Sequence, residues 1–137
     1  MLQRDYILRL IREFMAALQL LLEGKDLEHR REELKKLYEQ YIGPYELYHN
    51  ATIDVAMHAL ASYDEGQRLE RMEMLAELYY AEADTVTGPD RNFLLDKAFN
   101  LFSFIERNGK TFSMDRRYKM ALIEQRLKKC SGKTRCE

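Results

Sequence analysis

Four polar residues, Glu46, Asn50, Asp54 and His58, recur at intervals of four and could form a catalytic or ligand-binding site. In a helix this spacing places them along one slowly drifting stripe, called here the polar stripe. Asp54 could orient the imidazole of His58, a pairing used in both acid–base and metal chemistry. One hypothesis is therefore a small enzyme or ligand-binding protein. The other is a solvated edge, because a helix in a two-layer array usually keeps one side in water.

The other histidines and the cysteines do not complete a metal site by their spacing. His49 lies on the opposite side of the predicted helix from His58, because nine residues make two and a half turns. Cys130 and Cys136 have no histidine near them in sequence, whereas a zinc site normally takes four Cys or His ligands. We predict no metal, no cofactor and two free thiols in a reducing compartment.

Known catalytic motifs are missing from the sequence. The chain has no Walker sequence, no HExxH and no nucleophile elbow. This absence lowers the expectation of an enzyme without excluding one.

Tyrosines gather around the Gly43-Pro44 pair, at positions 38, 41, 45 and 48. At helical spacing such rings usually belong to the core, with the hydroxyl reaching water. Tyr45 and Tyr48 are predicted to be the exposed exceptions, because they lie next to the joint. Exposed aromatic side chains can serve as binding anchors. These two tyrosines and the polar stripe form the candidate ligand or partner site.

Charge is distributed unevenly along the chain. Residues 43–106 carry 4 basic and 12 acidic groups, a net charge of −8, whereas residues 107–137 carry 10 basic and 3 acidic groups, a net of +7. The basic end could bind nucleic acid or another acidic partner, or it could complement the acidic segment within the chain or a dimer. Nucleic acid is the weaker hypothesis, because no interleaved aromatics or glycine-rich phosphate loop accompany these charges. The candidate contacts are Arg116, Arg117, Lys128 and Lys129.

Glycines at 24, 43, 66, 88 and 109 mark the joints between apolar segments of helical period. The pattern predicts an all-α protein with about six helices. Their ranges are about 2–23, 26–42, 44–63, 66–86, 90–107 and 113–129. Asp26 and Ser113 are predicted helix N-caps. We expect one helical domain over residues 1–129 and a flexible basic tail over 130–137.

The composition is that of a soluble globular protein, with 137 residues of which 46% are hydrophobic and 33% charged. No apolar run is long enough to span a bilayer. Asp5 and Glu13 interrupt any signal-peptide core, so a cytoplasmic location is expected.

Two stretches resemble known families. Met72, Leu75, Ala76 and Tyr79, followed by Ala98, Phe102 and Ile105, resemble the two helices of a tetratricopeptide unit. The opening "QRDYILRLIREFMAALQLLLEGKD" resembles small all-helical bacterial proteins grouped as a family of unknown function. The first resemblance implies stacked antiparallel hairpins in a right-handed superhelix, and the alternative is a compact six-helix bundle. The second implies no activity, cofactor or catalytic residue.

One hypothesis is favoured by the regular spacing of the glycines between helices, the uneven distribution of charge and the broad apolar side of the first helix. The apolar side of residues 2–23 covers about half the helix circumference, which is more than two neighbouring helices require. Such a surface must meet the second and third helices or a partner chain. The leading prediction is therefore a non-enzymatic helical protein that binds another protein or itself.

Overall fold

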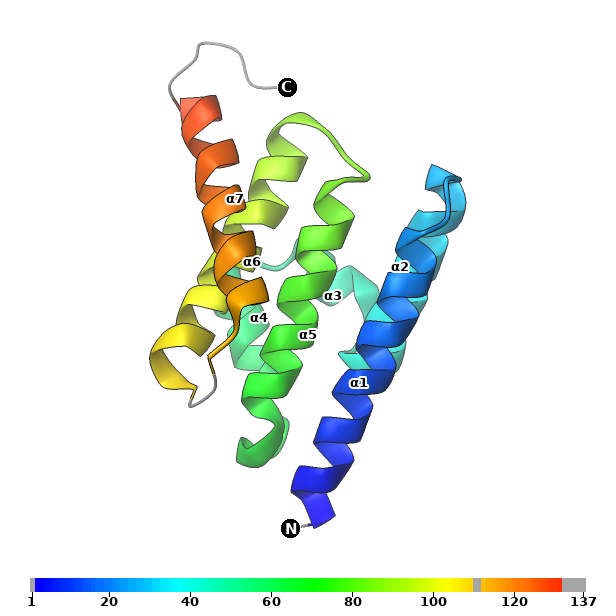
Figure 1. Ribbon diagram of the computed structural model, residues 1–137, viewed down its shortest axis with the longest axis vertical. Coiled ribbons are helices and arrows are strands. Elements are labelled where there is room, and N and C mark those ends of the chain that lie inside the picture. Colours follow the sequence, from blue (N-terminus) through cyan, green and yellow to red (C-terminus); the bar gives the residue numbers. More distant parts are fainter. Residues whose placement is uncertain (1, 110–111, 132–137) are drawn as a thin grey trace.

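The computed structural model describes residues 2–109 and 112–131, and its regular structure in these ranges is entirely helical (Figure 1). The all-α prediction is thereby confirmed. The helices are α1 (Leu2–Leu22), α2 (Leu27–Tyr41), α3 (Tyr45–Asn50), α4 (Ile53–Leu60), α5 (Glu65–Ala83), α6 (Gly88–Asn108) and α7 (Met114–Ser131).

Both predicted N-caps are confirmed. The Asp26 carboxylate accepts hydrogen bonds from the backbone N–H groups of Glu28 and His29, at 3.1 and 3.5 Å. The Ser113 hydroxyl accepts from the backbone N–H of Arg116 at 3.1 Å. Each cap satisfies an N–H that the first helical turn leaves without a partner, and so fixes where α2 and α7 begin.

The single helix predicted over residues 44–63 is wrong, because the chain breaks there into α3 and α4. Ala51, which ends α3, is extended with ψ 146°. Thr52 then caps α4, its hydroxyl accepting from the backbone N–H of Val55 at 3.4 Å. The described residues therefore contain seven helices rather than six, and the polar stripe is divided between two of them.

The central helix is α5. It packs against α1, α2, α4 and α6, while α7 packs on α6 (Figure 1). Met74, Leu75 and Leu78 of α5 are fully buried. Figure 1 shows α5 between α1 on one side and α7 on the other.

The glycines act at the joints for different physical reasons. Among the described residues only Gly88 has a positive φ, of 63°, and it begins α6. That conformation is costly for a residue with a Cβ atom. Gly43 is needed for space instead, because a Cβ there would lie 2.7 Å from Cε2 of Tyr48. Gly66 is the second residue of α5 and so lies at the joint between α4 and α5.

The flexible tail predicted over 130–137 lies mostly outside the residues that the structure describes. Helix α7 continues to Ser131, two residues into the segment predicted as a tail, and residues 132–137 lie outside the described part of the chain. The prediction for the thiols of Cys130 and Cys136 also falls outside what the structure describes. None of the described helices is long and apolar enough to cross a membrane.

Candidate functional site

The structure divides the polar stripe between two helices, α3 and α4. On α3 the Asn50 side-chain amide donates to the Glu46 backbone carbonyl at 2.8 Å, which is a local contact. Asp54 and His58 lie on α4, and both are exposed. No hydrogen bond joins these two described side chains. The proposed acid–base pair thus lacks the enclosure that a catalytic site needs.

The two candidate tyrosines have different environments. Tyr48 is only 3% exposed, so the prediction that it is an exposed anchor is wrong. Its ring is buried because Gly43 leaves room for it at the end of α2. Tyr45 is half-buried, and its hydroxyl donates to Glu82 Oε2 at 2.5 Å and lies 3.1 Å from His49 Nδ1.

Glu82 of α5 is the centre of a buried polar cluster that sequence analysis missed. Its carboxylate accepts from the hydroxyls of Tyr38 (2.6 Å) and Tyr45, and lies 2.9 Å from His49 Nδ1. Burial alone would raise the pKa of Glu82, but these three hydrogen bonds lower it below its ordinary value. A signal existed, because Glu82 lies seven residues after Leu75 and three after Tyr79, on the apolar face of α5.

Lys97 of α6 is a second buried charged group, with 1% of its surface exposed. Its ammonium donates to the backbone carbonyls of Tyr48 (3.2 Å), His49 (3.0 Å) and Ala51 (2.8 Å). It also lies 4.2 Å from the ring centre of Tyr79. Burial lowers the pKa of Lys97 to about 8, although the negative charge of Glu82 acts to raise it. This lysine therefore binds the carbonyls at the end of α3, which is a structural role.

The ionisation of Tyr38 is expected to weaken the fold at alkaline pH. Burial, followed by the charge of Glu82, raises the pKa of Tyr38 well above 10.0. The folded chain therefore keeps this proton above pH 10 while the unfolded chain loses it, so stability falls as the pH rises. Between pH 10 and 11 the wild type should lose about 1 kcal/mol more than the Tyr38→Phe variant.

Urea unfolding at both pH values measures this difference. Tyr118, 65% exposed, gives the matched control, and Tyr118→Phe should follow the wild type. Equal losses in the wild type and Tyr38→Phe would show that Tyr38 does not keep its proton.

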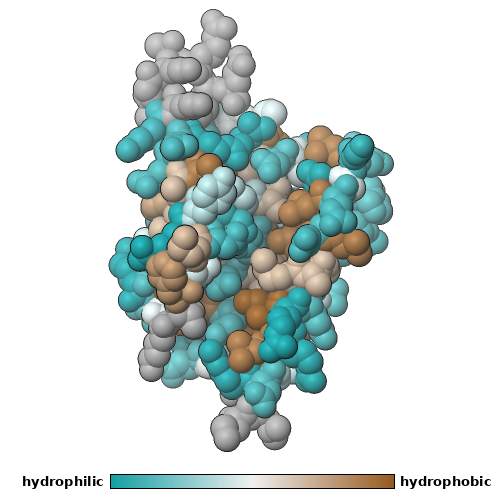
Figure 2. Space-filling model, in the orientation of Figure 1, coloured by the Kyte–Doolittle hydropathy of each residue, from teal (hydrophilic) through white to brown (hydrophobic). Residues whose placement is uncertain are grey.

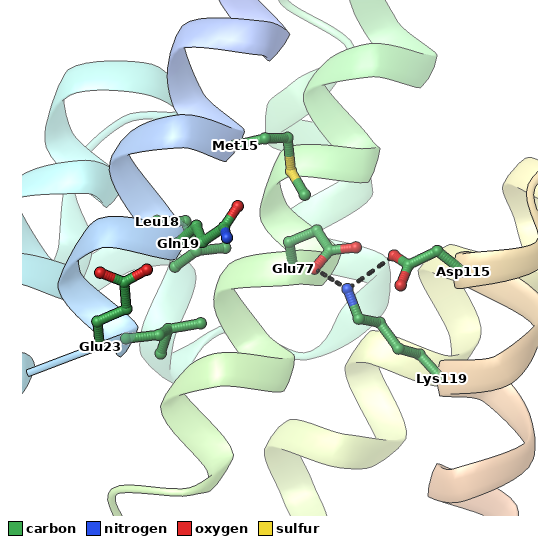
Figure 3. A pocket seen from close by; sticks show the side chains of 8 residues that line it. Met15, Leu18, Gln19, Glu23, Glu77, Asp115 and Lys119 are labelled. Atoms are coloured by element: carbon green, nitrogen blue, oxygen red, sulfur yellow. Dashed lines mark hydrogen bonds and ion pairs between the residues drawn. The ribbon is translucent and has the colours of Figure 1, made fainter.

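A cavity of about 490 Å³ lies between α1, α5 and α7 (Figure 3). Its α1 wall is a helical stripe with apolar Met15, Leu18 and Leu22, and Glu77 of α5 lies opposite. Figure 3 shows the α1 side chains on one side and α7 side chains reaching across from the other. Its lining residues are Met15, Leu18, Gln19, Leu22, Glu23, Glu77, Asp115 and Lys119.

The polar end of this cavity is an ion-pair cluster. Lys119 Nζ lies 2.7 Å from Glu77 Oε1 and 2.9 Å from Asp115 Oδ2 (Figure 3). The Glu77 side chain is only 5% exposed. Burial raises the pKa of Glu77, with Lys119 acting in the opposite direction. Burial would lower the pKa of Lys119, but the attraction of Glu77 and Asp115 raises it.

A second cavity, of about 530 Å³, lies along the N-terminal half of α5. Glu70 and Glu73 are among its lining residues. Because Glu70, Glu73 and Glu77 follow one another at spacings of three and then four, all three lie on the same side of α5. The two cavities together are called here the α5 groove. Figure 2 shows hydrophobic side chains gathered toward α1 and mainly hydrophilic ones over α7.

The basic residues predicted to contact an acidic partner largely contact acidic side chains of this chain. Arg116 is only 3% exposed and binds Glu106 Oε1 at 2.6 Å, with Glu73 Oε1 at 3.7 Å. Arg117 Nε binds Glu106 Oε2 at 3.0 Å. Lys128 is exposed, and the side chain of Lys129 is not described. The α7 charges thus neutralise part of the acidic segment within the chain.

No clustered metal ligands are found among the residues that the structure describes. No protein-family model matches the chain, and neither a curated protein nor a solved structure matches it. The features that bear on function are therefore those of the molecule itself, above all the α5 groove.

Proposed function

We propose that this chain is a non-enzymatic protein-binding domain that holds an amphipathic helix of a partner protein in the α5 groove. The observation that carries the proposal is a groove whose α1 wall holds three apolar side chains beside Gln19 and Glu23, and whose floor and opposite wall carry charged side chains. An amphipathic helix presents the same division between its two sides, and helix-in-groove binding is a common mode of peptide recognition.

The geometry of the groove suits a helix. Glu70 and Glu77 are seven residues apart on α5, which is about 10 Å along its axis at 1.5 Å per residue. The two cavities are each of a size that could bury several side chains, and each is lined by a carboxylate on the same side of α5, Glu70 in one and Glu77 in the other. A partner helix lying beside α5 would contact α1 on one side and α7 on the other, and would cover Leu22, which is 38% exposed.

A further cavity, of about 400 Å³ between α1 and α2, is a weaker candidate. Its ion pair, Lys36 with Glu33 at 2.9 Å, is exposed, with 72% of the Lys36 side chain in water. Exposed pairs of this kind contribute little to binding or stability. The α5 groove instead offers a buried carboxylate, whose interactions are much stronger.

We also propose that the helical hairpins stack as a superhelix, as the tetratricopeptide resemblance implies. Helices α1 and α2, and helices α5 and α6, are consecutive packed pairs joined by short connections. Stacked pairs of this type expose grooves that bind other proteins.

Site-specific photocrosslinking tests the proposed function in the cells that produce the protein. A benzophenone amino acid replaces Gln19, an exposed residue that lines the groove. The matched control carries it at Glu13, an exposed α1 residue turned about 120° away that lines none of the three cavities described here. Mass spectrometry then identifies the crosslinked peptide.

We expect a crosslink from position 19 and none from position 13, to a segment with apolar residues at helical spacing. Equal crosslinking from both positions, or none from position 19, contradicts the groove as the binding site. A crosslink to a second copy of this chain would mean that the groove serves self-association and does not bind a different protein.

A further inference from the structure

We infer that the partner helix carries a lysine or arginine that takes the place of Lys119 on the Glu77 carboxylate. This inference rests on the proposed function and adds the chemistry of the partner. The Lys119 ammonium, 2.7 Å from Glu77 and 2.9 Å from Asp115, shows which group this end of the cavity accepts. It lies where Figure 3 shows α7 reaching across to α5.

Glu77 requires a positive charge. Its side chain is 5% exposed, and an ionised carboxylate that is buried without a partner is strongly disfavoured. The other ionisable lining residues are Glu23 and Asp115, both acidic, and Lys119. Three carboxylates thus face one ammonium, so an incoming cation is favoured and an incoming anion is repelled.

Lys119 is able to give up its place. Helix α7 packs on α6, and its ion pairs with α5 are made by long side chains. The lysine has a flexible four-carbon stem, and 18% of its side chain already meets solvent. The Asp115 carboxylate, 63% exposed, can keep the displaced ammonium at the rim of the groove.

The same pairing recurs further along the groove, which extends the match to a helix. Glu70 binds Arg4 of α1 at 2.8 Å, and the Arg4 side chain is 55% exposed. Glu70 and Glu77 are separated by two helical turns. A partner helix with basic residues seven apart, beside an apolar stripe facing Met15, Leu18 and Leu22, would complement both carboxylates.

Two synthetic peptides test the inference. They are alanine- and leucine-based amphipathic helices of about 18 residues, long enough to be helical in isolation. They differ at one position on the edge of the apolar face, which carries lysine in one and norleucine in the other. Fluorescence anisotropy measures the binding of both to the full chain.

The lysine peptide should bind the wild type more tightly than the norleucine peptide does. Lys119→Met removes the internal cation and should increase this preference by about tenfold, as expected for a hydrogen-bonded charge pair. The Lys119→Met/Glu77→Gln double variant leaves no buried charge unpaired and should lose this increase, because only the exposed carboxylates of Glu23 and Asp115 remain in the lining. Lys36→Met, which removes an exposed ammonium outside the groove, is the matched control and should change nothing.

The outcomes separate the two proposals. If Lys119→Met leaves the preference unchanged, or the double variant keeps the increase, the cation does not replace Lys119. Equal binding of both peptides would also contradict the cation inference, but it would still agree with a helix-binding groove. If neither peptide binds although position 19 crosslinks to a helical segment, the cation inference fails and the proposed function stands. Circular dichroism of each variant checks that it is folded. If Lys119→Met is not folded, the comparison is made between the wild type and the double variant.

Discussion

Replacing Glu82 by leucine is expected to lower the free energy of unfolding by about 3–5 kcal/mol, as for the loss of one partner from a buried charged network. The carboxylate accepts from the buried Tyr38 hydroxyl and the half-buried Tyr45 hydroxyl, and it lies 2.9 Å from His49 Nδ1. Leucine leaves all three groups without this acceptor. Because Tyr38 is fully buried, water cannot replace the lost bond.

Urea unfolding at pH 7 measures the loss. Glu82→Gln, which keeps an acceptor oxygen, should lose less than Glu82→Leu. Glu46→Leu removes an exposed carboxylate from α3 and should change stability by less than about 0.5 kcal/mol. A loss in Glu82→Leu as small as in Glu46→Leu would mean that the cluster does not stabilise the packing of α2 and α3 on α5.

Replacing Lys97 by alanine is the second large effect, with an expected loss of about 3–4 kcal/mol. The change removes the donor to three carbonyls around the end of α3 and leaves a cavity beside the Tyr79 ring. Tyr48 keeps one partner, because the Tyr79 hydroxyl also donates to its carbonyl at 2.6 Å. The carbonyls of His49 and Ala51 lose the lysine donor.

The pH dependence of this variant distinguishes the lysine charge from its volume. The pKa of Lys97 is lowered to about 8 in the folded chain from 10.5, so the native state releases the proton first. The unfolded state then holds more protons than the native state between pH 8 and 10.5, and stability rises with pH in that window. The stability of the wild type relative to Lys97→Ala should therefore increase from pH 7 to pH 9.5.

Unfolding in urea at these two pH values provides the measurement. Lys36→Ala, at an exposed site, is the control and should show neither the loss at pH 7 nor the pH-dependent gain. A constant difference between the wild type and Lys97→Ala at both pH values would contradict the lowered pKa.

Helix identity and most helix ends could be predicted from the sequence. The caps at Asp26 and Ser113 were predicted correctly, because a cap binds N–H groups two or three residues away and so is encoded locally. The break at Ala51 was missed. Residues 44–63 have a helical pattern throughout, and the carbonyls that end α3 are bound by Lys97, 46 residues beyond Ala51.

The candidate site shows the same division. Tyr45 is one of the predicted site residues, but its partner Glu82 is 37 residues away in the sequence. The α5 groove could not be foreseen at all, because Leu18 and Lys119 face one cavity from helices about a hundred residues apart. Spacing along one helix says which residues share a face but not which other helix that face meets.

The all-helical class, the two caps and the opposite charges of the middle and the end of the chain can be predicted from the amino-acid sequence alone. Those properties follow from hydrogen bonds within a few residues and from composition. The burial of Glu82 and Lys97, the binding of Arg116 to acids of its own chain, and the place of Glu77 in the lining of a cavity follow from the tertiary structure. Burial and charge pairing depend on distant segments meeting, because a side chain loses its water only when another element covers it.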